Sequence, residues 1–239
     1  MIFHKLILQY LKHKDDEGFY RLQAEDTVRW LEKSGVELGC ETSVLDLGCG
    51  HGIIGGELFS RGCPVTFADE TNQLLPEYQD LPFVSIDIDK DDLGTLGTYD
   101  LVICSNVLEH IPRPAQLLDS VDRILEPEGK LYLSWGNWLS PWGGHDLSPF
   151  HYLGPHCGPR VYDRLFGREL IHTPYVTLFP TTIGQTIRMI RRNPRLHILS
   201  ILPRYYPKLA FITRIPCLRE FLTWNCVIFV EKVACGNCP

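Results

Sequence analysis

The chain has 239 residues, of which 44% are hydrophobic and 22% are charged, and its formal net charge is −6. This length suits one sizeable α/β domain with an insertion, or two small domains, and no apolar run reaches the roughly 20 residues that a membrane span needs. The stretch 1–14 is apolar and basic but has no small-residue cleavage site, which argues against a secretory signal. We predict that it forms a docking helix of the mature protein, with contact to a membrane surface as the alternative.

The charge is distributed unevenly along the chain. Residues 1–150 carry 11 Lys and Arg against 25 Asp and Glu, whereas residues 151–239 carry 12 against 4. Part of the basic excess is a cluster of four arginines, Arg188, Arg191, Arg192 and Arg195. The cluster is either a solvated helix face or an attraction for an anionic substrate or surface. Nucleic acid is not expected as a partner, because the acidic part of the chain would repel it.

Nine cysteines are present, an odd number that favours a reducing, cytoplasmic location over a disulfide framework. Cys235 and Cys238 form a C-x-x-C pair near the end of the sequence. A zinc site needs about four ligands, and no second pair stands at a matching spacing. We therefore predict thiols without a metal role.

The first predicted elements are a helix over 17–33, then a strand, a glycine turn and a second helix within S-V-L-D-L-G-C-G-H-G-I-I-G-G-E-L-F at 43–59. Strand, glycine turn and helix form the nucleotide site of doubly wound sheets. The dinucleotide fingerprint G-x-G-x-x-G fails here, because Ile53 stands at its sixth position. Tyr20 and Gln23 of the first helix are placed to face this site.

Acidic residues follow the next two predicted strands. Asp69 follows the strand 65–68, about 20 residues past the glycines, where a doubly wound fold places the carboxylate that binds ribose; a helix N-cap is the alternative. The strand 83–86 is followed by Asp87, which can accept the adenine amino group, and by Ile88.

The fourth strand, 99–104, leads into S-N-V-L-E-H-I-P at 105–112, at the sheet edge where α/β sites are built. A helix over 115–125 and a turn at 127–130 then lead to a fifth strand, 131–135. The order of D-L-G-C-G-H-G, S-I-D-I, Y-D-L-V-I-C-S-N-V-L-E-H-I-P and R-I-L-E-P-E-G-K-L-Y-L-S resembles class I S-adenosylmethionine (SAM)-dependent methyltransferases. It is most similar to the group that includes ubiquinone-biosynthesis-type enzymes (methyltransferase type 11).

The resemblance covers about 41–136 and implies a doubly wound, mostly parallel seven-stranded sheet with a Rossmann-like methyltransferase fold. It also implies SAM as the cofactor. By the resemblance, the residues that hold it are Asp46, Gly48, Gly50 and Gly52 with Ser105 and Asn106 on the methionine side, Asp69 at the ribose, and Asp87 with Ile88 at adenine. One departure is Glu128, where the family often has glycine, in a turn far from the pocket.

The remaining chain predicts a single domain with a substrate cap inserted after the fifth strand. N-terminal helices occupy 1–40, the SAM-binding core 41–136, the cap 137–180, and a helix and strands that complete the sheet 181–239. The stretch 137–159 is rich in Pro, Gly, Trp and His without helical or strand period, and its aromatic side chains suit a pocket wall. We expect helices over 161–166, 181–192 and 209–222, the last broken by Pro216, and strands over 196–202 and 224–230. By the resemblance, the final strand lies antiparallel beside the sixth.

Methyl transfer to a hydroxyl profits from a base with a pKa near neutrality, and His110 and His145 are the candidates. Glu109, His110 and Asp146 form an alternative divalent-ion site, without a spacing motif to support it. We predict a methyltransferase that acts on a small-molecule or saccharide/glycolipid acceptor, by O-methylation. The alternatives are a SAM-binding module without turnover and, less favoured, a nicotinamide-dependent oxidoreductase.

Overall fold

The computed structural model describes residues 16–233, so the predicted helix over 1–14 and the Cys235–Cys238 pair lie outside the described residues. A seven-stranded sheet has the order β3-β2-β1-β4-β5-β7-β6. The strands are β1 (Val44–Leu47), β2 (Val65–Asp69), β3 (Phe83–Ser85), β4 (Tyr99–Ser105), β5 (Leu125–Gly136), β6 (Leu196–Pro203) and β7 (Asn225–Lys232). Pairing is parallel from β3 to β5, and β7 lies antiparallel between β5 and β6. The predicted fold class and the antiparallel final strand are confirmed.

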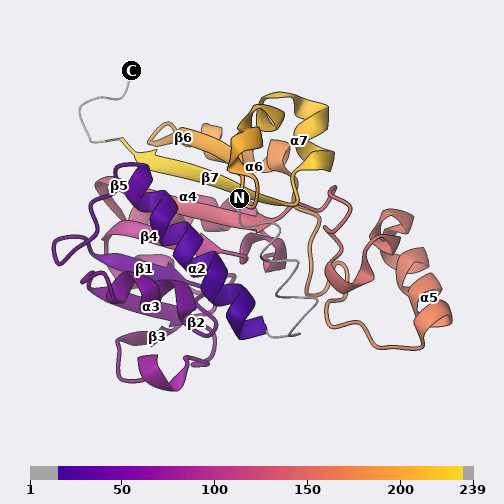
Figure 1. Ribbon diagram of the computed structural model, residues 1–239, viewed down its shortest axis with the longest axis horizontal. Helices are drawn as coiled ribbons and strands as arrows, with labels where there is room; N and C mark the ends of the chain where they lie inside the picture. The colour runs from indigo at the N-terminus through magenta and orange to yellow at the C-terminus, as the bar shows by residue number, and fades with distance from the viewer. Residues whose placement is uncertain (1–15, 234–239) are drawn as a thin grey trace.

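Helices cover both faces of the sheet (Figure 1). The α-helices are α2 (Asp16–Lys33), α3 (Ile53–Phe59), α4 (Pro114–Ile124), α5 (Gly154–Phe166), α6 (Ile183–Arg192) and α7 (Pro216–Leu222). Short 3-10 helices are η1 (Pro76–Tyr78), η2 (Leu93–Leu96), η3 (Leu108–His110), η4 (His145–Leu147), η5 (Phe150–Leu153) and η6 (Pro207–Arg214). Among residues 16–233, no helix is both long and apolar enough to cross a membrane.

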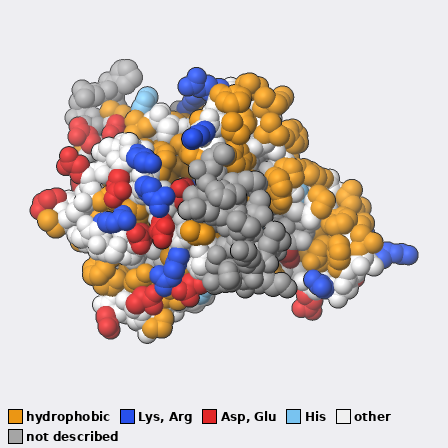
Figure 2. Space-filling model, viewed as in Figure 1, with side chains coloured by type: hydrophobic (Ala, Val, Ile, Leu, Met, Phe, Trp, Pro, Cys, Tyr) orange, Lys and Arg blue, Asp and Glu red, His pale blue; other side chains and the backbone are white. Residues whose placement is uncertain are grey.

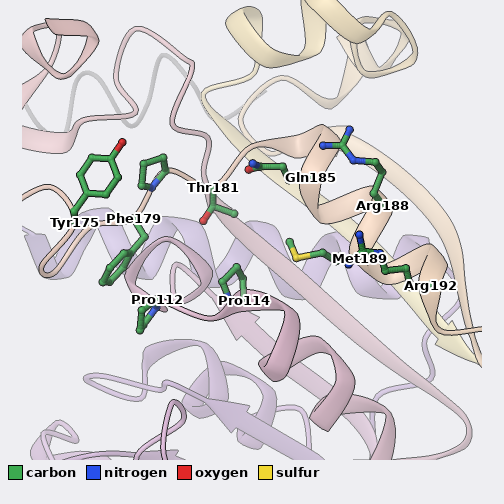
Figure 3. Close-up of a pocket in the computed structure, with 10 residues that line it drawn as sticks. Pro112, Pro114, Tyr175, Phe179, Thr181, Gln185, Arg188, Met189 and Arg192 are labelled. Carbon is green, nitrogen blue, oxygen red and sulfur yellow. The ribbon is translucent and has the colours of Figure 1, made fainter. Parts of the chain in front are cut away.

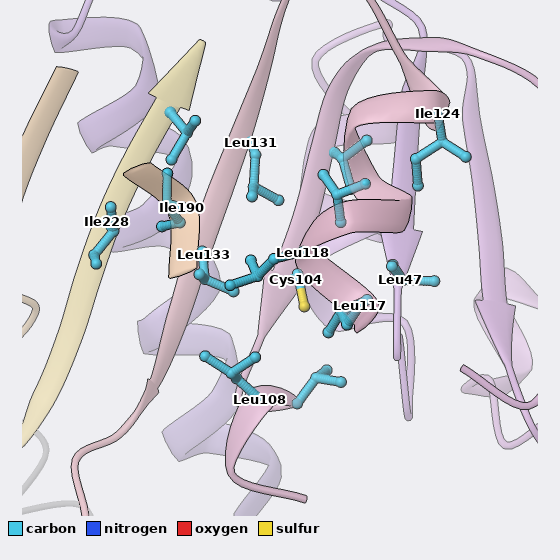
Figure 4. Packing of buried hydrophobic residues seen from close by; sticks show 14 of the residues in the cluster. Leu47, Cys104, Leu108, Leu117, Leu118, Ile124, Leu131, Leu133, Ile190 and Ile228 are labelled. Atoms are coloured by element: carbon cyan, nitrogen blue, oxygen red, sulfur yellow. The ribbon is translucent and has the colours of Figure 1, made fainter. Parts of the chain in front are cut away.

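The central strands are buried on both faces because helices pack on each side. Leu101 and Ile103 of β4 pack in the cluster that includes α2 and α3. Val102 and Cys104, which alternate with them, pack in the cluster that includes α4 and α6. Figure 4 shows this second cluster, in which side chains of α4 and Ile190 of α6 lie over β4 and β5. The strand period of two therefore sends neighbouring residues into two separate cores.

The fifth strand is longer than predicted. It begins at Leu125, which is fully buried and pairs with Tyr99, and the register then shifts before Lys130 pairs with Leu101. The predicted turn at 127–130 is thus an irregularity inside the strand. Glu128 has a φ of 64° there, in the region that favours glycine.

The segment after β5 contains more helix than its sequence predicts. The helix expected over 161–166 begins already at Gly154, and Pro159 lies inside it. Pro155 is tolerated because the first helical residues have no intrahelical partner for their N–H groups. An added Cβ on Gly158 would lie 2.5 Å from the Phe150 carbonyl oxygen, so close packing requires glycine here. Gly154, Pro155, Gly158 and Pro159 interrupt the helical spacing of apolar residues, so the sequence pattern predicted only the C-terminal part of this helix.

Candidate functional site

The glycine loop follows β1 at the point where the strand order reverses between β1 and β4. Ligands of open α/β sheets bind in the crevice at such a point. A cavity of about 280 Å³ lies there, lined by Tyr20, Asp46, Gly48, Cys49, Gly50, His51, Ile53, Ile54, Ser105 and Asn106. Five of the predicted SAM-binding residues therefore line one cavity, together with Tyr20 of α2, which the sequence placed at this site.

The three glycines of the loop all have positive φ, but they are glycine for different reasons. An added Cβ on Gly48 would lie 2.3 Å from the Val107 side chain, and one on Gly52 would lie 2.5 Å from Leu74. Nothing lies within 4 Å of an added Cβ on Gly50. The first and third glycines are thus required by protein packing, and Gly50 leaves open space at the cavity for a ligand.

Two of the predicted carboxylates accept backbone hydrogen bonds, one from the loop and one from the helix that follows it. One oxygen of Asp46 accepts the Gly55 N–H at 2.8 Å, and burial raises the pKa of this carboxyl to about 7. Asp69 accepts the Gly50 N–H at 2.8 Å and the Glu70 N–H at 2.7 Å. Asp69 therefore stands directly beside the loop, although it is not among the residues that line the cavity.

The predicted adenine residues lie after β3. Asp87 pairs with Lys90 at 2.6 Å and accepts the Asp89 N–H at 3.0 Å. The Lys90 ammonium lowers the pKa of Asp87. Ile88 is partly buried and packs against the core. Neither residue lines the cavity, so their contact with adenine stays a prediction.

A polar network surrounds Ser105 and Asn106, which line the cavity. Asn106 adopts a φ of 57°, accepts a hydrogen bond from Asn225 at 2.8 Å and donates to Gln23 at 3.4 Å. The hydroxyl oxygens of Ser105 and Ser134 lie 2.9 Å apart. The network joins α2, β4, β5 and β7, and it includes Gln23, which the sequence predicted to face the cofactor.

Arg204 was missed by the sequence analysis. It is only 2% exposed, and it donates to the hydroxyls of Ser105 at 3.1 Å, Ser134 at 3.2 Å and Thr27 at 3.0 Å. Within residues 16–233 no carboxylate forms an ion pair with it, and its Nε is buried without a partner. Its charge opposes the rise in pKa that burial causes at Asp26 and Glu109. A single arginine after an apolar strand gives no sequence signal that its side chain will be buried beside the cofactor cavity.

The two predicted catalytic histidines come together at the ends of β4 and β5. The ring centroids of His110 and His145 are 5.6 Å apart, and His172 lies 5.0 Å from His110 and 4.9 Å from His145. Burial, followed by the charges of His172 and His110, lowers the pKa of His145 to about 4. Glu109 is 2% exposed beside them. His172 was missed, because one histidine in a loop 62 positions from His110 carries no signal.

Asp146, predicted as an alternative metal ligand, has another role. One of its oxygens accepts the Ile171 N–H at 2.8 Å, next to His172. It therefore ties two parts of the inserted segment together.

The arginine cluster divides between two roles. Arg195 forms an ion pair with Asp122, whose side chain is fully buried. Arg188 and Arg192 line a second cavity of about 460 Å³, which also includes Tyr175, Phe179 and Met189 (Figure 3). This cavity shares no lining residue with the cavity at the glycine loop. Although larger, it lacks the strand-end carboxylates and glycines of a nucleotide site.

Comparisons with known proteins agree with this geometry. A family model described as "Methyltransferase domain" matches residues 45–131. An uncharacterised methyltransferase of Mycobacterium tuberculosis is 30% identical over 227 residues, which cover 91% of this chain and 89% of that protein. Another from Mycobacteroides abscessus is 30% identical over 240 residues, covering 90% and 87%.

Solved structures share the fold. A SAM-dependent methyltransferase from Mesorhizobium loti has a TM-score of 0.56 at 21% identity, covering 82% of this chain and 93% of that chain. The magnesium protoporphyrin IX methyltransferase of Synechocystis, with bound S-adenosylhomocysteine, has a TM-score of 0.56 at 16% identity, covering 89% and 83%. The chain therefore belongs to the class I methyltransferase family, whose methyl donor is SAM.

Proposed function

We propose that this methyltransferase transfers the methyl group of SAM to a hydroxyl of a small-molecule or saccharide acceptor. The observation that carries the proposal is the group of imidazoles at the ends of β4 and β5. It begins four residues after Asn106, which lines the cofactor cavity. A hydroxyl arrives protonated and profits from a base, whereas an amine needs little help. Three neighbouring histidines therefore favour O-methylation.

The donor fits the cavity at the glycine loop. The backbone of Gly50 borders open space, and Asp69 lies beside it to accept the ribose hydroxyls. Ser105 and Asn106 border the end assigned to methionine. Behind Ser105, the buried guanidinium of Arg204, whose Nε has no partner, offers a positive charge to the methionine carboxylate. Bound SAM supplies an electrophilic methyl group on a sulfonium.

Proton removal is assigned to His110. His145 beside it is assigned to position the acceptor hydroxyl, because a pKa of about 4 makes it a weak base near pH 7. The His110 Nδ1 lies 2.6 Å from the Thr177 carbonyl oxygen, which can only accept, so the proton sits on Nδ1 and Nε2 is left basic. As the acceptor oxygen loses its proton to an imidazole, its electron pair forms the bond to the methyl carbon. The carbon–sulfur bond breaks and its electrons stay on sulfur. Alignment of the acceptor oxygen with the methyl group supplies the remaining rate acceleration.

The inserted segment supports a ring-shaped acceptor with a lipid or anionic part. Trp142 is half exposed and stacks on Trp224 at 5.0 Å, a surface suited to a sugar ring. Exposed hydrophobic side chains gather over α5 and α7 in Figure 2, among them Phe166 and Phe221. They support a glycolipid acceptor or contact with a membrane surface. The cavity with Arg188 and Arg192 offers a place for an anionic group.

Radiolabelled SAM, incubated with the purified protein and with cell-extract fractions, tests the proposal. We expect label in an organic acceptor, and NMR of the product to show a methyl ether or ester. The His145→Ala variant should lose most of its turnover and keep its SAM affinity, whereas His156→Ala, an exposed residue of α5, serves as the control. SAM binding without transfer to any fraction would instead support the binding-module alternative. Label on nitrogen or carbon would contradict O-methylation.

A further inference from the structure

Four residues from three separate segments form a cluster that we call the histidine–glutamate cluster: Glu109, His110, His145 and His172. Glu109 and His110 belong to η3, His145 begins η4, and His172 lies in the loop before α6. One potential ligand atom from each of Glu109, His110 and His145 lies within 4.8 Å of the other two. The His172 ring centroid lies 5.0 and 4.9 Å from those of His110 and His145. Donor groups at these separations can converge on one ion.

The surrounding chain holds these donors in place. Glu109 Oε1 accepts the Gly136 N–H at 2.8 Å, while Oε2 is buried without a partner among the described residues. His110 donates from Nδ1 to the Thr177 carbonyl, which leaves Nε2 free. Metal-binding histidines commonly donate their second ring N–H to a carbonyl or carboxylate in this way. The buried, unsatisfied oxygen of Glu109 calls for a cation or donor that the described residues do not provide.

His145 is held in a less favourable backbone conformation. Its φ is 52°, in the left-handed region, where such residues cluster at functional sites. An added Cβ on Gly136 would lie 3.3 Å from Glu109 Oε1 and 3.4 Å from His145 Nε2. The imidazole therefore points toward the carboxylate.

We propose that the histidine–glutamate cluster binds one divalent first-row transition ion of the Zn²⁺ class, through Glu109, His110 and His145, with His172 as the fourth ligand. Imidazole and carboxylate donors suit zinc and related ions. Calcium and magnesium prefer sets of oxygen ligands and are disfavoured here. Metal binding stands on this geometry alone. Its consequence for catalysis rests on the proposed function: an ion held by the cluster would take the place of the imidazole base, lower the pKa of the acceptor hydroxyl and let the released proton pass to solvent.

The test uses full-length, tag-free protein dialysed against EDTA, in a Cys235→Ser/Cys238→Ser background so that those thiols do not bind the ion. Calorimetry with Zn²⁺ and visible spectroscopy with Co²⁺ should show one equivalent bound. Glu109→Gln and His172→Gln should each weaken binding, the former by at least 100-fold, and His197→Ala, an exposed residue of β6, should leave it unchanged. Circular dichroism and SAM binding report whether each variant is folded, and His110→Gln replaces any variant that is not.

The outcomes separate the two proposals. Equimolar binding that the cluster variants lose supports the site. Absence of binding in folded wild-type protein, or equal affinity in wild type and all cluster variants, overturns it. Methyl transfer by metal-free protein that Zn²⁺ does not stimulate overturns the catalytic consequence and leaves O-methylation standing. Failure of transfer with every acceptor, while Zn²⁺ still binds, counts against the proposed function alone.

Discussion

The cofactor cavity and the histidine–glutamate cluster lie at the same edge of the sheet, but they are assembled differently. The cavity takes seven of its ten lining residues from Asp46 and from the single run that begins at Gly48. The cluster takes its residues from η3, from η4 and from a loop, with a strained His145 between them. The cofactor cavity is thus encoded locally, whereas the histidine–glutamate cluster, the proposed acceptor site, depends on long-range packing. Substitutions that affect one and spare the other test this contrast.

The largest expected effect is on the cofactor cavity. Gly50→Val places a side chain into the open space that the ligand needs, and we expect SAM affinity to fall about 100-fold or more. Gly35→Val is the matched control, because Gly35 also has positive φ and open space. Both variants carry the same kind of backbone strain, so calorimetry with SAM isolates the ligand clash. Equal SAM affinities would contradict the assigned loop.

The converse experiment breaks the inserted segment and leaves the donor site intact. An added Cβ on Gly143 would lie 2.2 Å from the Trp138 carbonyl oxygen, which is backbone and cannot move aside cheaply. For Gly143→Ala we expect at least a tenfold loss of turnover, measured with labelled SAM, and a SAM affinity within about threefold of wild type. Gly39→Ala, in open space and without a positive φ, is the control. A parallel loss of SAM affinity would show that the two sites are not separable.

Arg204 interacts with both regions: it donates to Ser105 of the cofactor cavity, and its charge acts on Glu109 of the cluster. Replacing it with Met removes the buried charge behind Ser105 while keeping the length of the side chain. We expect SAM affinity to fall about tenfold, in the range of a lost hydrogen bond to a charged group. The exposed Arg214→Met is the control. If affinity for SAM is kept while stability rises, the guanidinium has no role at the carboxylate.

The smallest effect concerns the charge of Asp46. Its pKa of about 7 in the folded protein exceeds the value of about 3.9 for an unfolded aspartate. Protonation therefore favours the folded state, and this contribution is lost as pH rises from about 4 through 7. Asp46→Asn keeps an oxygen for the Gly55 N–H without the charge. Urea unfolding without SAM should show the variant gaining on wild type, on the order of 1 kcal/mol, between pH 5.5 and pH 8. Parallel pH curves would contradict the shifted pKa.

Local patterns allowed the sequence to predict the strand, glycine turn and helix that surround the cofactor cavity. The apolar run before Gly48 and the helical spacing after Gly52 lie within 16 residues of each other, from Val44 to Phe59. The predicted carboxylates at strand ends follow the same rule, and the structure places Asp69 beside the loop. The sequence did not predict the exact ends of some elements. One example is the start of β5 at Leu125, whose side chain is buried and whose backbone pairs with Tyr99.

The sequence by itself determined the sheet, the order of its motifs and the family, because each depends on residues close together in the chain. Only the tertiary structure brought His172 to His110 and Arg204 to Ser105, because contacts between residues far apart in sequence leave no periodic pattern. It also revealed α5, whose prolines and glycines conceal its helical period. The methyl donor can therefore be predicted from sequence. The side chains proposed to act on the acceptor come together only when distant segments pack against each other.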